Sequence, residues 1–194
     1  DWSSDVCSSD LMYNSLADIS DCMDVPMDFM LPKFANESGL HVNAMGGAAN
    51  DGGLGQFTES ALKDVIQNLP TEGRNIRKSG KPSCRRLLAI EGAMPETADD
   101  IKFTDPERCH VIAMPPNPIR SLIYYGIFYN ATKRNALNNW KKPYPDQEES
   151  LEDLLRLAGG EDLSTEAIKK MLFVQSYNIG PGKPPVYLRM WLNY

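Results

Sequence analysis

Apolar residues recur at helical spacing between residues 24 and 39, with polar residues on the opposite face. This is the i, i+3, i+4, i+7, i+8 pattern of a half-buried helix. Its apolar positions are Met27, Met30, Leu31, Phe34 and Ala35. Pro26 suits the start of a helix and Gly39 suits its end. Pro32 lies inside the segment and predicts a kink, because proline removes one backbone hydrogen bond.

A second helical pattern begins after Thr58, whose side chain is a good N-cap. Its apolar positions are Ala61, Leu62, Val65, Ile66 and Leu69. Pro70 is predicted to end this helix. Residues 71–116 lack sustained periodicity and mix charges with Pro and Gly. We therefore predict a long irregular insertion there, with a short strand at residues 87–90.

Helical patterns return in the last part of the chain. Asn117 and Pro118 open a helix that is predicted to run to about residue 138. A polar linker at residues 141–149 precedes further, shorter helices. They begin near Ser150, Ser164 and Pro184. Since neither an internal repeat nor an alternation of strands and helices is present, the predicted class is mainly α.

Composition and charge narrow the possible functions. The 194 residues suffice for one domain with a substantial core. A net charge of −6 lacks the basic excess of nucleic-acid-binding proteins. No apolar run approaches the roughly 20 residues that span a bilayer. His41 and His110 each stand alone in the sequence, and no cysteine–histidine spacing matches a zinc site.

The first eleven residues, 1–11, resemble a translated sequencing adapter, a contaminant of assembled metagenomic genes. We expect them to lie outside the fold, so that the domain occupies residues 12–194. Tyr194 ends inside an amphipathic run. For both reasons we expect the chain to be a fragment of a longer protein. The lack of a visible signal peptide then says nothing about location.

Of the four cysteines, Cys7 falls in the adapter-like segment. Cys84 and Cys109 flank one segment and are candidates for a disulfide in an oxidising compartment. Free buried thiols are an equally open alternative, so the cysteines give only a weak signal about redox environment.

Glu37 is the leading candidate for chemistry. It follows Met30 by seven residues and Phe34 by three, which places it on or beside the apolar face of its helix. It also falls in the last turn, where the helix dipole is negative. Burial and the dipole both disfavour a carboxylate, so we expect a raised pKa. A carboxyl protonated near neutral pH can act as a general acid. A surface Glu at a frayed helix end is the plain alternative.

Four short segments carry a family resemblance when taken in order. Glu37-Ser38-Gly39 ends the first helix, and Gly53-Leu54-Gly55-Gln56 follows in a Gly-rich loop. Residues 122–129 run Leu-Ile-Tyr-Tyr-Gly-Ile-Phe-Tyr, and residues 176–182 run Ser-Tyr-Asn-Ile-Gly-Pro-Gly. Together they resemble the Glu-Ser-Gly, Gly-Leu-Met-Gln, Asn-Ile-x-x-Gly-x-x-Tyr and Ala-Tyr-Asn-Ala-Gly-x-Gly motifs of the soluble lytic transglycosylase (SLT) domain. The resemblance covers most of residues 20–192 and implies a lysozyme-like fold.

The resemblance also implies a role for each site residue. Glu37 would be the sole catalytic acid/base. Ser38 and Gln56 would hold the saccharide, Tyr177 would orient Glu37, and Asn178 would shape the site. Structural alternatives stay open: a helix-end hydroxyl for Ser38, a loop amide for Gln56 and a packed ring for Tyr177.

Two glycines within these motifs carry further expectations. Gly55 stands where the family has Met, which we expect to open space in the floor of the site. Gly126, by contrast, is expected to be a close-packing position rather than a ligand contact.

The implied reaction cleaves the β-1,4 bond between MurNAc and GlcNAc in peptidoglycan and forms a 1,6-anhydro sugar. This mechanism requires neither a metal nor an organic cofactor. The expected location is the periplasm or cell envelope of a bacterium, inferred from this substrate. The insertion at residues 71–116 would wall a substrate groove or bind an envelope protein.

Two alternatives remain beside this one. In a goose-type-lysozyme-like hydrolase, Asp51 would activate water, although the Asn50-Asp51-Gly52-Gly53 sequence also suits a simple turn. In a non-catalytic peptidoglycan-binding module, the fold would be kept without turnover.

Overall fold

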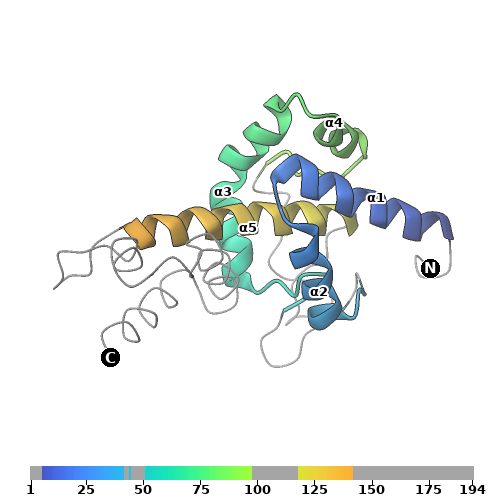
Figure 1. Cartoon of the computed structure of the whole chain (residues 1–194), viewed down its shortest axis with the longest axis horizontal. Helices are drawn as coiled ribbons and strands as arrows, with labels where there is room; N and C mark the ends of the chain where they lie inside the picture. The colour runs from blue at the N-terminus through green and yellow to red at the C-terminus, as the bar shows by residue number, and fades with distance from the viewer. Residues whose placement is uncertain (1–5, 42–43, 45–50, 98–117, 142–194) are drawn as a thin grey trace, which may run out of the picture. The chain divides into compact units, whose positions relative to one another are not determined.

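The computed structural model describes residues 6–41, 44, 51–97 and 118–141. Most of these residues belong to helices, which Figure 1 colours along the chain. The helices are α1 (Val6–Met23), α2 (Met27–Ser38), α3 (Glu59–Lys78), α4 (Pro82–Ala89) and α5 (Pro118–Lys141). Within the described ranges, β pairing is limited to an isolated antiparallel bridge between Gly52 and Phe57. The predicted mainly α class is confirmed.

The chain forms two compact units, residues 1–130 and residues 131–194, and α5 contributes to both. The first unit contains every described residue of the candidate site. No described helix is long and apolar enough to cross a membrane.

Helix α2 matches its sequence prediction closely. It starts directly after Pro26, keeps Pro32 in its interior and stops before Gly39. Gly39 has a φ of +59°, a left-handed conformation that glycine adopts without a Cβ clash. The Gly39 N–H bonds to the Ala35 carbonyl and the Leu40 N–H bonds to the Phe34 carbonyl, so two carbonyls at the helix end are satisfied. Met30 and Phe34 are fully buried, which fixes the inward face of α2.

Helix α3 begins as predicted, because the Thr58 hydroxyl accepts a hydrogen bond from the Ala61 N–H at 3.2 Å. It does not end at Pro70, so that prediction was wrong. Pro70 lies on the exposed side, and the buried stripe continues beyond it through Gly73 and Ile76. Burial of that second half outweighs the one hydrogen bond that proline cannot donate.

Helix α4 overturns the short strand predicted at residues 87–90. Pro82 begins the helix, and its buried residues are Ser83, Cys84 and Leu87. That spacing of one and four residues fits a single helix face, whereas a short apolar run cannot by itself distinguish helix from strand. Residues 71–78 and 82–89 are therefore helical rather than irregular. Residues 98–116 of the proposed insertion lie outside the described residues.

The first described helix begins within the adapter-like stretch. Helix α1 starts at Val6, so residues 6–11 of the adapter-like stretch are helical. Their origin as a translated adapter stays a prediction.

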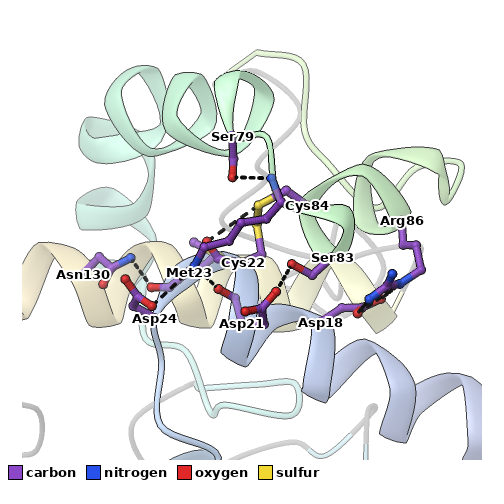
Figure 2. Close-up of a disulfide and its surroundings, with 11 residues drawn as sticks. Asp18, Asp21, Cys22, Met23, Asp24, Ser79, Ser83, Cys84, Arg86 and Asn130 are labelled. Atoms are coloured by element: carbon purple, nitrogen blue, oxygen red, sulfur yellow. Dashed lines mark hydrogen bonds and ion pairs between the residues drawn. A yellow bond between two sulfur atoms is a disulfide. The ribbon is translucent and has the colours of Figure 1, made fainter.

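The cysteine prediction was wrong in its pairing. Cys84 forms a disulfide with Cys22, 62 residues earlier, and is not available to Cys109. The bond joins α1 to α4, with Cα atoms 4.9 Å apart (Figure 2). Sequence spacing could not select this pair, because the two cysteines are brought together by helix packing.

Gly126 lets α1 and α5 approach closely. A Cβ at Gly126 would fall 2.4 Å from the Met23 sulfur and 3.6 Å from Ile19 Cγ2. One turn further along α5, the Asn130 amide donates to the Met23 carbonyl at 3.0 Å. The expected close-packing role of Gly126 is confirmed.

Tyr129 predicts an alkaline loss of stability. Burial, helped by the charge of Asp28, raises its pKa to about 12, whereas an unfolded tyrosine titrates near 10. The folded state therefore holds the Tyr129 proton more tightly than the unfolded state does. The resulting contribution to the free energy of unfolding is complete below pH 10 and is lost as the pH rises through 12. Urea unfolding between pH 9 and 12 should show wild type losing up to roughly 2 kcal/mol more than Tyr129→Phe. Equal losses of stability in wild type and in Tyr129→Phe would show that Tyr129 does not have this raised pKa.

Candidate active site

Glu37 lies in the last turn of α2 and forms an ion pair with Lys33, one turn earlier. Its side chain is 34% exposed, whereas that of Lys33 is only 16% exposed. The apolar enclosure predicted for Glu37 is therefore not what the structure has. The carboxylate is partly open to solvent and carries a lysine counter-charge. Sequence reasoning missed Lys33 because it considered only the apolar positions of the helix. The signal was available, since Lys33 precedes Glu37 by four residues and side chains at that spacing are neighbours on a helix.

Ser38 is buried, and its hydroxyl donates to the Phe34 carbonyl at 2.9 Å. This is the bond that a serine makes back to its own helix. In the structure, Ser38 is therefore a helix-end hydroxyl, which was the alternative to a saccharide-binding role. A saccharide contact through this hydroxyl would require that bond to be given up or shared.

A tight reversal connects the end of α2 to the Gly-rich loop. After Gly39, Leu40 also has a positive φ, +66°, and its N–H bonds to the Phe34 carbonyl. The N–H of His41 then bonds to Ser38 O, and that of Ala44 bonds to His41 O, at 3.0 and 3.1 Å. Leu40 remains 52% exposed although it is apolar. The reversal thus leaves a hydrophobic side chain in solvent three residues after Glu37.

The Gly-rich loop is closed by the bridge between Gly52 and Phe57, which exchange two backbone hydrogen bonds. Gln56 has a φ of +46° and sends its side-chain nitrogen back to the carbonyls of Gly53 and Ala44, at 2.9 and 3.3 Å. The Gly53 N–H also bonds to Ala44 O at 2.8 Å. Ala44 therefore ties the segment after Glu37 to the loop that carries Gln56. The amide nitrogen is thus used within the loop, so a saccharide contact by Gln56 would have to be made by its side-chain oxygen.

Tyr125, on α5, packs against both of these segments. Its ring meets that of Phe34 edge-on, with centroids 4.6 Å apart. A Cβ on Gly55 would lie 3.4 Å from the Tyr125 ring and 3.0 Å from that of Phe57. The space that we expected Gly55 to open is thus filled by two aromatic rings, and that prediction was wrong. Tyr125 is fully buried and connects the α2 end, the loop and α5.

Asp51, at the start of the loop, has a buried oxygen, Oδ1, with no hydrogen-bond partner in the part of the chain that the structure describes. A buried acceptor without a partner is costly in a folded protein, and such groups are often functional. Tyr177 and Asn178, the remaining predicted site residues, lie outside the described residues. Among the described residues, no group of His, Cys, Asp and Glu could hold a metal ion.

No family model, curated protein or solved structure matches this chain. The family resemblance therefore rests on its sequence motifs alone, and the structure bears on how three of those motifs are arranged.

The left-handed backbone at Gln56 gives a direct test of the loop. We expect Gln56→Ala to be less stable than Gln56→Gly by about 1 kcal/mol, because a Cβ is disfavoured at this φ. At an ordinary position glycine is the more destabilising of the two. Urea unfolding of both variants measures the difference. A more stable alanine variant would argue against the left-handed turn.

Proposed function

We propose that the protein is a peptidoglycan lytic transglycosylase of the bacterial envelope, with Glu37 as its single acid/base. The observation that carries the proposal is the convergence of three motif segments. The Glu37 end of α2 and the Gln56 loop are joined through Ala44, and both pack on Tyr125 through Phe34 and Gly55. Segments that resemble one family's motifs are thus neighbours in space as well as ordered in sequence.

The chemistry needs one carboxyl group. Protonated Glu37 gives its proton to the glycosidic oxygen as the bond from C1 of MurNAc breaks. The N-acetyl group of the same sugar stabilises C1, in place of the second carboxylate of most glycosidases. The ionised Glu37 then takes the proton of the MurNAc 6-hydroxyl as that oxygen bonds to C1. Water is neither consumed nor released.

Lys33 bears on the first step. A general acid must present its carboxyl group to the glycosidic oxygen, whereas in the structure the Glu37 carboxyl group is paired with the Lys33 ammonium. The proposal therefore requires Lys33 to separate from Glu37 when the saccharide binds. The pair is partly exposed, so its rupture costs little, about 0.5 kcal/mol.

A hydrolase is the second candidate, and Asp51 favours it. Its oxygen Oδ1 is buried and has no partner among the described residues, as a base that is to hold a water molecule would be. In that case Glu37 would protonate the leaving group, and Asp51 would activate the water that attacks C1.

Product analysis distinguishes the candidates. Purified protein is incubated with peptidoglycan sacculi, and the soluble products are examined by mass spectrometry. Ends of 1,6-anhydro-MurNAc support the transglycosylase, and reducing ends, one water heavier, support the hydrolase. If the products have reducing ends, Asp51→Asn should abolish activity. If they have anhydro ends, Asp51→Asn should leave the product unchanged. Binding to sacculi without any product, by a protein shown to be folded, would reject both in favour of a binding module.

A further inference from the structure

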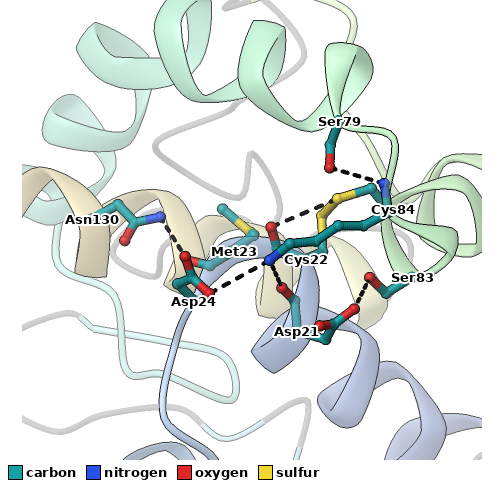
Figure 3. A network of polar contacts seen from close by, with 9 residues as sticks. Asp21, Cys22, Met23, Asp24, Ser79, Ser83, Cys84 and Asn130 are labelled. Carbon is teal, nitrogen blue, oxygen red and sulfur yellow. Dashed lines mark hydrogen bonds and ion pairs between the residues drawn. A yellow bond between two sulfur atoms is a disulfide. The ribbon is translucent and has the colours of Figure 1, made fainter.

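The C-terminal end of α1 is completed by side chains from distant parts of the chain. The last carbonyls of a helix have no partner within it. Here the Lys81 ammonium donates to the Asp21 carbonyl, and the Asn130 amide donates to that of Met23. The Cys84 sulfur lies 3.6 Å from the Cys22 carbonyl between them. Figure 3 shows Asp21, Met23 and Asn130 close to the disulfide between Cys22 and Cys84.

Polar pairs continue the junction along α1 and α4. The Ser83 hydroxyl donates to the Asp21 carboxylate, and the Arg86 guanidinium forms a two-nitrogen pair with Asp18, as Figure 2 shows. The side chain of Arg86 is 62% exposed. Exposed pairs of this kind contribute little to stability, because water and salt screen them. They orient α4 but cannot by themselves hold it.

Helix α4 is short and buries one large apolar side chain, Leu87. It is eight residues long, and an isolated helix of that length is not stable in water. Its buried residues are Ser83, Cys84 and Leu87; Leu87 is its one large apolar side chain in the core, and Cys84 belongs to the disulfide. The covalent bond is therefore the strongest tie between α4 and α1.

We propose that the Cys22–Cys84 disulfide is a redox lock on this junction, so that the native fold matures only in an oxidising compartment. On closing, the two thiols lose two protons and two electrons to a disulfide oxidant, which becomes a dithiol. On opening, one thiolate of a reduced dithiol attacks the Cys22 sulfur, and Cys84 leaves as a thiolate. The second thiol of the dithiol then displaces Cys22 as a thiolate, so that the dithiol ends as a disulfide. Cys22 is the half-buried residue of the pair. Reduction of the disulfide frees α4 from α1 and destabilises the turn that leads from α1 into α2.

The size of the effect follows from the chain between the cysteines. A cross-link over 62 residues removes much of the freedom of the unfolded chain. For a chain of this size we expect reduction to lower the melting temperature by roughly 10 °C. The inference does not depend on enzymatic activity, so it can fail while the proposed function holds, and the reverse.

The experiment uses a Cys7→Ser/Cys109→Ser parent of the full chain, in which Cys22 and Cys84 are the remaining cysteines. The parent is folded under oxidising conditions, denatured and alkylated. We expect no alkylated thiol, and after trypsin a linked pair of peptides that separates on reduction. Two alkylated thiols in the folded, oxidised parent would overturn the proposal.

Stability and local opening are then measured on the already folded parent, with and without dithiothreitol. The melting temperature should fall by roughly 10 °C, and trypsin should cut after Arg85 and Arg86 of α4 at least several-fold faster. Adding Cys22→Ser and Cys84→Ser should reproduce both changes and remove the response to dithiothreitol. Lys81→Met, which keeps the disulfide, serves as control and should shift melting less. An unchanged melting temperature and cleavage rate after reduction would reject the lock.

Discussion

Glu37→Gln is expected to lower the release of 1,6-anhydro products from sacculi by about 10³-fold, because the amide can neither give nor take the proton that both steps require. The effect on stability should be small. The substitution removes one partly exposed ion pair with Lys33, worth about 0.5 kcal/mol. Product release is measured by mass spectrometry against time, and folding is checked by thermal melting.

Glu59→Gln is the matched control. Glu59 forms the same kind of i, i+4 pair with Lys63, with both side chains more than half exposed, and lies in the first turn of α3. The same atoms are exchanged at a surface site, so its product release should equal that of wild type. If Glu37→Gln retained most of its activity, Glu37 could not be the acid/base. If both variants lost activity equally, the loss would not be specific to Glu37.

Tyr125→Ala is expected to lower the free energy of unfolding by about 3–5 kcal/mol, the usual cost of truncating a large buried aromatic residue. The ring packs against Phe34 and Phe29, with centroids 4.6 and 6.4 Å away, and the Gly55 backbone also approaches it closely. Alanine would leave a cavity between α2, the Gly-rich loop and α5. Urea unfolding measures the loss.

Tyr13→Ala provides the comparison for this second prediction. Tyr13 is 61% exposed on α1, so the same truncation there should change stability by no more than about 0.5 kcal/mol. Tyr125→Phe keeps the ring and should retain most of the stability that Tyr125→Ala loses. Similar losses for Tyr13→Ala and Tyr125→Ala would show that Tyr125 does not organise the core.

The differences between sequence prediction and structure have separate physical causes. Helix α2 was predicted well, because the Pro26 start, the apolar spacing and the Gly39 stop are all local signals. Pro70 misled because its cost is also local, about 3 kcal/mol, whereas the burial that offsets it involves residues beyond it. Helix α4 was missed because four apolar residues fit a strand as well as a helix.

The candidate site divides in the same way. Sequence order singled out Glu37, Gln56 and residues 122–129, and the structure brings these segments together. It could not supply the Lys33 ion pair of Glu37, the hydrogen bond from Ser38 to its own helix, or the rings that fill the space at Gly55. Each of these depends on side-chain direction, which residue spacing constrains only loosely.

The sequence by itself determined the helical class, the start and end of α2, the N-cap of α3 and the order of the candidate motifs. Periodicity and capping act over a few residues, so they can be recognised in one chain. Tertiary structure alone decided that Cys22 pairs with Cys84, that α3 continues past Pro70, and that Tyr125 joins Phe34 to Gly55. Those outcomes depend on contacts between residues far apart in the chain, whose energies appear only when the helices pack.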